Sequence, residues 1–169
     1  LPEAHGGLGF GYKGMGAIFE QAGRNLSVMP LLSSAVLGAG LLVEAGSSAQ
    51  QEAHLPAILG GESLFALALD EQARHNPLSI ATKAEKSGDT FVLSGEKVFV
   101  LDGHVATHLI VAARTSGQNS PNPREAMQGI SLFLLEAQAA GENITRKHML
   151  DSRNAATLET TQAHAQLLG

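Results

Sequence analysis

The sequence contains no cysteine among its 169 residues. This absence excludes disulfide bonds, thiolate metal sites and cysteine nucleophiles. A cluster of positive charge is also missing, because the 11 lysines and arginines are scattered and the formal net charge is −5. Nucleic acids and anionic membranes are bound by basic patches, so we expect neither as a partner. The lack of cysteine fits a reducing compartment, and we expect the protein in the cytoplasm.

Long hydrophobic runs are scarce, and only one approaches the length of a membrane span. Residues 26–43 contain no charged side chain. Pro30 and the serines at 27, 33 and 34 interrupt this run. We therefore expect a buried core helix that begins near Pro30, in which the hydroxyls of Ser33 and Ser34 bond carbonyls of the preceding turn.

The remaining composition is that of a globular protein. Hydrophobic residues make up 44% of the chain and charged residues 16%, which is enough apolar surface for a core and too little charge for disorder. The chain begins at Leu1, without Met and without a signal-peptide pattern. We interpret it as a piece of a longer protein, with one large or two small domains. It has no internal repeat.

The first third of the sequence has helical patterns. Residues 12–24 place Met15, Ile18, Phe19 and Ala22 on one helix face. Residues 30–45 form the apolar helix, which Gly46 ends.

A third helix is expected over residues 48–59. Ser47 and Ser48 are its N-cap candidates, and Gln51 stands three residues after Ser48, as in a capping box. Pro56 is expected to kink the helix or begin its last turn, and Gly60-Gly61 to end it.

After Gly61 the pattern changes to short strands separated by turns. Ser94, Gly95 and Glu96 are expected to be a polar turn between two apolar strands. Residues 116–128 are polar and rich in proline, which predicts a long exposed loop. The expected strands are 63–69, 79–86, 90–95, 98–101, 108–114, 130–136 and 156–163, with turns at 87–89, 102–103 and 141–143. Strands at this spacing predict a barrel or sandwich after the helices, and hence an α+β chain.

Motifs for chemistry are few. Residues 9–14 match G-x-G-x-x-G, but no hydrophobic strand precedes them, so we interpret them as an entry loop and not a dinucleotide site. His104 and His108 flank a turn and have no evident third ligand, which argues against a metal site. No G-x-S-x-G nucleophile motif occurs. Asp70-Glu71 begins a polar cluster at a strand end, for which ligand contact and a solvated loop are equally plausible.

The order of several local patterns is more specific than any one of them. PEAHGGLG (2–9), GESLFALALDE (61–71), ATKAEKSGDTFVLSGEKVFVLDG (81–103), ATHLIVAAR (106–114) and GISLFLLE (129–136) follow one another in register. This order resembles the acyl-CoA dehydrogenase family over nearly the whole chain. The resemblance implies part of an N-terminal all-α domain of about three helices at 1–62. It also implies a middle antiparallel β-barrel domain at 63–169.

The resemblance also implies an activity. Family members bind FAD and dehydrogenate acyl-CoA thioesters to enoyl-CoA, with a glutamate base usually in a C-terminal helical bundle. That bundle is absent here, so no catalytic residue is assigned and the chain alone is expected to be inactive. An acyl-CoA substrate, an electron-transfer flavoprotein as acceptor and a homo- or hetero-oligomer, dimer or tetramer, are the implied partners. The implied flavin contacts are Leu67, Leu69, Asp70, Glu71, Phe99, Val100 and Leu101, and the implied substrate contacts are Arg74, His75 and Asn76.

Two departures from the family pattern bear on these contacts. Asp70 stands where a hydroxyl residue usually bonds the flavin, and it is expected either to face the flavin or to pair with Arg74. Leu101 also replaces a hydroxyl residue. Together with the sequence Glu-Gln-Ala-Arg at residues 71–74, they resemble the small subunit of pimeloyl-CoA-type dehydrogenases. A second hypothesis is therefore a non-catalytic partner subunit with a degraded flavin site, and a third is a ligand-binding β module.

Overall fold

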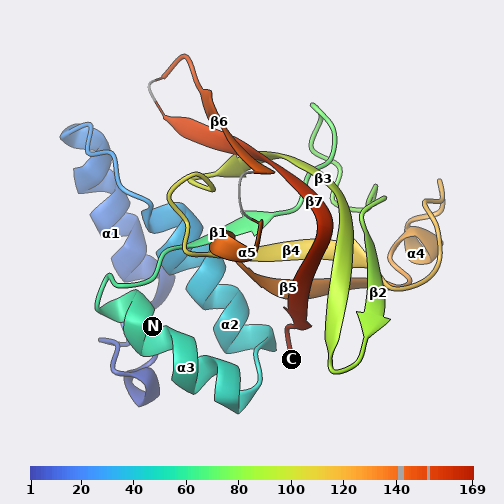
Figure 1. The fold of residues 1–169 in the computed structure, drawn as a ribbon. Helices are drawn as coiled ribbons and strands as arrows, with labels where there is room; N and C mark the ends of the chain where they lie inside the picture. Colours follow the sequence, from blue (N-terminus) through green and yellow to red (C-terminus); the bar gives the residue numbers. More distant parts are fainter. Residues whose placement is uncertain (141–142, 152) are drawn as a thin grey trace.

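Helices occupy most of the first third of the chain and strands the remainder, which confirms the predicted α+β class. The computed structural model describes residues 1–140, 143–151 and 153–169. In Figure 1 the helices α1, α2 and α3 lie together on one side of the strands. The helical elements are a 3-10 turn (Glu3–His5), α1 (Gly11–Arg24), a π-helix (Leu31–Gly38), α2 (Ala39–Ala45), α3 (Ser48–Leu59), α4 (Pro123–Ala126) and α5 (Ala137–Ala140).

The apolar helix begins directly after Pro30, as predicted, but its first 8 residues are wound as a π-helix. The α2 turns that follow bury Ala39 and Leu42 completely. The apolar face predicted for α1 is not covered by the rest of the described chain, since no residue of α1 is buried. No helix within the described ranges is long and apolar enough to cross a bilayer.

Helix α3 is capped by the first of its two predicted N-cap candidates, and its capping box lies one residue earlier than predicted. Ser47, not Ser48, is the N-cap: its hydroxyl accepts from Gln50 N, and the Gln50 side chain accepts from Ser47 N. Gln51 has another use, because its amide donates to Val43 O at 3.2 Å and Gly46 O at 2.9 Å. Gln50 is therefore the residue that completes the capping box, whereas Gln51 bonds carbonyl groups at the end of α2.

The described residues form a sheet of seven strands. β1 and β2 pair with β4 in parallel, and the other pairings are antiparallel. The pairings of β2, β3, β7, β5 and β4 close a ring, to which β1 is added at β4 and β6 at β7. The strands are β1 (Phe65–Ala68), β2 (Lys83–Ser87), β3 (Thr90–Leu101), β4 (His108–Arg114), β5 (Ile130–Glu136), β6 (Ile144–His148) and β7 (Asn154–Leu167).

The predicted turn at Ser94–Glu96 is wrong. Residues 90–95 and 98–101 belong to the single strand β3, in which Gly95 pairs with Thr160 of β7. Thr160 Oγ1 also donates to Gly95 O at 3.0 Å. Polar residues suit this stretch because Ser94 and Glu96 point to solvent, while Leu93 and Lys97 on either side of them are buried.

Other boundaries differ for local reasons. β2 begins at Lys83 and not at 79, because the backbone amides of Ala81 and Thr82 donate to the Glu71 side chain and not to a neighbouring strand. The exposed edge strand β6 has no alternating apolar pattern and was not predicted. The polar segment 116–128 contains the short helix α4, which Asn122 caps. The turns at 87–89 and 102–103 are confirmed, whereas Gly141 and Glu142 of the third turn lie outside the described residues.

Strands β4 and β5 bury both of their faces, which explains their unbroken apolar sequences. Leu109 and Val111 of β4 face one core, enclosed by the ring of strands, together with Phe133 and Leu135 of β5. The alternate residues Ile110 and Leu134 face a second core. Its other buried members are Ala39 and Leu42 of α2, Leu55 of α3, Phe65 of β1, and Leu168, which follows β7. The sheet therefore fixes the helices relative to the strand ends. The division into domains at 62/63 remains a prediction, with α3 ending at Leu59 and β1 beginning at Phe65.

Two histidines meet between α3 and the sheet. The ring of His108 stacks on Phe65 at 4.8 Å between centroids, and His54 of α3 lies 4.9 Å from His108. Burial lowers the pKa of His54, an effect that Glu136 partly offsets. Burial also lowers the pKa of His108, and the nearby His54 lowers it further while Glu136 acts in the opposite sense.

These histidines predict that folding is weakened by mild acid. Their pKa values are below the ordinary 6.5 in the folded state, so the unfolded chain binds more protons. Stability is complete above pH 6.5 and is lost as the pH falls from there through the folded pKa values. The urea midpoint of the purified protein, measured between pH 8 and pH 5, should fall with acid, and His54→Gln/His108→Gln should flatten the profile. His164→Gln, at an exposed histidine, is the control. If the urea midpoint changed equally with pH in the double variant and the wild type, the two histidines would not cause the loss of stability in acid.

Candidate functional site

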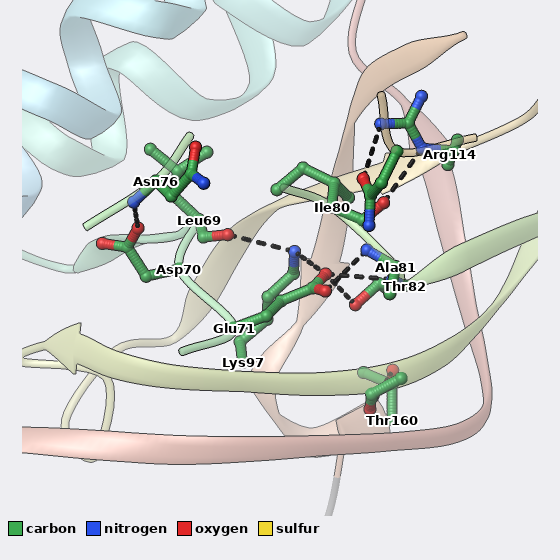
Figure 2. A network of polar contacts seen from close by, with 12 residues as sticks. Leu69, Asp70, Glu71, Asn76, Ile80, Ala81, Thr82, Lys97, Arg114 and Thr160 are labelled. Carbon is green, nitrogen blue, oxygen red and sulfur yellow. Dashed lines mark hydrogen bonds and ion pairs between the residues drawn. The ribbon is translucent and has the colours of Figure 1, made fainter. Parts of the chain in front are cut away.

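The end of β1 lies against the middle of β3, so two segments far apart in the sequence meet. Val98 N donates to Asp70 O at 2.8 Å. Lys97 Nζ donates to Leu69 O at 3.2 Å. The structure thus places Leu69–Glu71 beside Lys97 and Val98 (Figure 2). These two residues directly precede residues 99–101, which the sequence analysis assigned to the same site as Leu69–Glu71.

A buried ion pair joins these segments. Lys97 Nζ lies 2.7 Å from Glu71 Oε1, and the two side chains are 1% and 9% exposed. Glu71 Oε1 also accepts from Thr82 N at 2.9 Å and Thr82 Oγ1 at 2.6 Å, while Oε2 accepts from Ala81 N at 2.6 Å. The Glu71 carboxylate is therefore enclosed by protein donors, as Figure 2 shows.

The surroundings favour the charged form of Glu71 and act against the charged form of Lys97. Burial by itself raises the pKa of the Glu71 carboxyl, but hydrogen bonds from Lys97, Thr82 and Ala81 outweigh it and lower the pKa. Burial lowers the pKa of the Lys97 ammonium, and the negative charges of Glu71 and Asp70 offset part of that effect. Lys97 was not identified from the sequence. Its signal is positional, because it follows Leu93 and Gly95 at every second residue of β3 and so points inward.

Asp70 pairs with a different residue from the one the sequence suggested. Its carboxylate lies 2.9 Å from His75 Nδ1 and accepts from Asn76 N at 3.1 Å. The expected partner, Arg74, is exposed on the same loop. An Asp side chain folds back easily on the chain a few residues ahead, and this geometry favours His75 and Asn76 over the longer Arg74. Asn76 also lines a surface hollow with Leu78, Ser79 and residues of 119–126.

Phe99 is held in an unusual backbone conformation. Its φ is +54°, in the left-handed region, and its side chain is 55% exposed. It stands in a β-bulge, where the register between β3 and β7 shifts between Lys97 and Val100. A bulky residue in this region costs about 1–3 kcal/mol, and such strain gathers at ligand sites. Val100 next to it is buried in the core, so its side chain is not accessible to a ligand.

The turn that follows β3 is anchored to the π-helix. Asp102 has a φ of +55°, and Ser33 Oγ lies 2.6 Å from its Oδ2. The same hydroxyl lies 3.1 Å from Pro30 O, which confirms the predicted bond between Ser33 and a carbonyl of the preceding turn. Ser34 does not bond the preceding turn, but accepts from Phe65 N at 3.1 Å. Both serines therefore fasten the helical part to strands beside the site.

Comparison with known families decides what kind of protein this is. A model of the acyl-CoA dehydrogenase middle domain matches residues 66–163, and one of the N-terminal domain matches residues 1–62. The chain belongs to the acyl-CoA dehydrogenase family. The family resemblance inferred from the order of its motifs is thereby confirmed.

Individual members of the family are moderately similar. Mitochondrial isovaleryl-CoA dehydrogenase of Pongo abelii is 34% identical over 149 residues, which are 86% of this chain and 34% of the relative. Cyclohex-1-ene-1-carbonyl-CoA dehydrogenase of Geobacter metallireducens is 33% identical over 144 residues, 83% of this chain and 36% of the relative. A solved steroid ACAD has a TM-score of 0.83 at 29% identity, over 100% of this chain and 43% of that one. The chain spans about a third of the length of these curated relatives.

In this acyl-CoA dehydrogenase family member, the two histidines that are four residues apart, His104 and His108, lie in different elements. His104 lies in the turn after β3, and His108 begins β4 and stacks on Phe65. Within the described parts of the chain, no group of three or more histidine or acidic side chains could hold a metal ion.

The Ser33–Asp102 bond predicts a stability effect. Ser33 is 1% exposed, so Ser33→Ala leaves a half-buried carboxylate without its donor. We expect the free energy of unfolding, measured with urea, to fall by about 1.5–3 kcal/mol. Ser27→Ala, at an exposed serine, should change it by less than about 0.5 kcal/mol.

Substitutions of the acceptor check the same bond. Asp102→Asn keeps an acceptor oxygen and tolerates positive φ, so it should cost less stability than Asp102→Ala. Wild-type stability in Ser33→Ala would mean that this bond contributes nothing.

Proposed function

We propose that this chain is the helical and flavin-binding part of an FAD-dependent acyl-CoA dehydrogenase. The observation on which the proposal rests is Phe99, an exposed aromatic side chain held in a strained bulge beside the end of β1. Family membership supports the proposal, and the relatives named above are dehydrogenases of acyl-CoA thioesters.

The residues at this place suit a planar ring with a polar edge. Phe99 offers an aromatic face, and the half-buried Leu67, Leu69 and Leu101 offer apolar contact. Asp70 and Glu71 would contribute backbone groups, because the two carboxylates are already bonded within the protein, whereas Val100 is buried and would support the site from the core. FAD, when bound, would supply the oxidising power by accepting a hydride from the β-carbon of the thioester.

The loop after Glu71 is the proposed contact for the CoA portion of the substrate. Arg74 and His75 are exposed there, and Asn76 lines the adjoining hollow. The guanidinium of Arg74 can donate two parallel hydrogen bonds to a phosphate, which suits the phosphate groups of CoA. The carboxylate that removes the α-proton is expected from outside these 169 residues. An oligomer, and an electron-transfer flavoprotein as acceptor, belong to the same proposal.

One observation favours a second candidate, a non-catalytic partner subunit. The Asp70 carboxylate is turned to His75 and Asn76, and Leu101 has no hydroxyl, so neither side chain offers the flavin a hydroxyl hydrogen bond. The lost bond is worth about 1 kcal/mol if water does not replace it. Such a subunit would keep the fold and assist an active homologue.

Flavin content separates the two candidates. The full-length protein, purified and incubated with excess FAD, should retain a yellow flavin whose visible absorbance is bleached by an acyl-CoA such as isovaleryl-CoA. Phe99→Leu should weaken FAD binding between about twofold and about tenfold, through loss of ring stacking. Phe10→Leu, at another exposed phenylalanine, is the control and should leave it unchanged. A full-length protein that stays colourless in excess FAD would refute the dehydrogenase proposal and favour the partner subunit.

A further inference from the structure

The Lys97–Glu71 ion pair is not part of the lining of the hollow at Asn76, yet it connects the loop that contains Asn76 to the strand that carries Phe99. We propose that this pair is a positioning device, which sets Asp70 and the loop of residues 72–80 relative to Phe99. The inference rests on the proposed function, because it assigns the pair to the flavin and acyl-CoA site.

Glu71 closes the loop at its base. The chain leaves Glu71, passes through the exposed residues 72–77, and returns to place Ala81 N and Thr82 N on the same carboxylate, at 2.6 and 2.9 Å. Both ends of the loop are thus held at one side chain. This removes freedom from a segment that would otherwise have to be ordered when a ligand binds.

Lys97 fixes the residue between its two contacts. Its ammonium binds Leu69 O, before Asp70, and the Glu71 carboxylate, after Asp70. Val98 N binds the carbonyl of Asp70 itself. Lys97 stands two positions before Phe99 on β3. This strand therefore carries both the ammonium that holds the end of β1 and the aromatic ring of Phe99. A shift at Lys97 would move both.

The C-terminal end of the loop is also held by Arg114. This side chain is 7% exposed, and its Nε donates to Ile80 O at 2.9 Å. Its other nitrogens donate to carbonyls of residues 126 and 128. Figure 2 shows Arg114 and Glu71 on either side of residues 80–82, so the loop has two anchors and an exposed tip.

Close packing around Thr82 supports the positioning role of the ion pair. A methyl group added to Gly95 would lie 2.7 Å from Thr82 Cα, so β3 approaches Thr82 as closely as glycine allows. This approach brings the Thr82 hydroxyl to Glu71 and leaves its oxygen at 2.6 Å from the carboxylate.

Stability alone is a weak reason for a buried ion pair, because apolar residues of similar size often serve a fold equally well. That fact supplies a test that separates positioning from folding. In the full-length protein, Lys97→Met/Glu71→Leu removes both charges together and leaves neither buried alone. Lys97→Met and Glu71→Gln remove one each, and Lys97→Arg keeps the charge. Lys86→Met, at an exposed lysine of β2, is the matched control.

Two measurements are made on each variant. Amide hydrogen exchange at Ala81 and Thr82 reports on the loop base, and titration with FAD and an acyl-CoA reports on the site. We expect exchange at least about tenfold faster in the double variant, with FAD and acyl-CoA dissociation constants raised by about tenfold while the fold is kept. Lys97→Arg should restore most of both, and Lys86→Met should resemble the wild type.

The outcomes distinguish the two proposals. A folded double variant with exchange rates and ligand affinities within about twofold of the wild type would overturn the positioning role. Faster exchange with unchanged affinities would also overturn it, since the pair would then be structural only. If the wild type itself takes up no flavin, the proposed function fails, and the positioning role in a flavin site falls with it. Exchange at Ala81 and Thr82 then still decides whether the pair closes the loop.

Discussion

A single buried contact, between the Lys97 ammonium and the Glu71 carboxylate, is the interaction on which the arrangement of the site depends. It joins the end of β1, the start of β2 and the middle of β3, which are separate in the chain. Charges so far from water are stable only when every donor and acceptor finds a partner, and here the carboxylate accepts four hydrogen bonds. The geometry of the neighbouring residues is therefore narrowly defined, including that of Asp70 and, through β3, of Phe99.

Apolar packing on both faces of the sheet holds the strands that carry this contact in place. β4 and β5 separate two apolar cores, one within the ring of strands and the other against α2 and α3. Ser33 and Ser34 add polar anchors from the π-helix to Asp102 and to the backbone of Phe65. The helical part is thus held against the strands by apolar packing and by hydrogen bonds close to the proposed flavin face. This arrangement lets a strained residue such as Phe99 persist, since the surrounding packing over-determines its position.

Much of the fold could be predicted from sequence patterns, whereas most of the site could not. Periodicity and glycine positions located the helices and most strands, but they divided β3 at Ser94–Glu96, because a strand with one polar face resembles a turn there. The choice of Ser47 over Ser48 depended on where Gln51 finds carbonyls, which is a tertiary matter. Lys97 was missed because its partner is 26 residues away. Family resemblance supplied the identity of the site segments, but not the partner of Asp70, which depends on the course of the loop.

The central claim is that the surface formed by Leu69–Glu71 and residues 97–101 receives the flavin. A crystal structure of the full-length protein grown with FAD tests it most directly. Our account predicts the isoalloxazine ring in contact with Phe99 and with the backbone beside Asp70 and Leu101, above an intact Lys97–Glu71 pair. A flavin bound elsewhere on the protein, with Phe99 facing solvent, would contradict it.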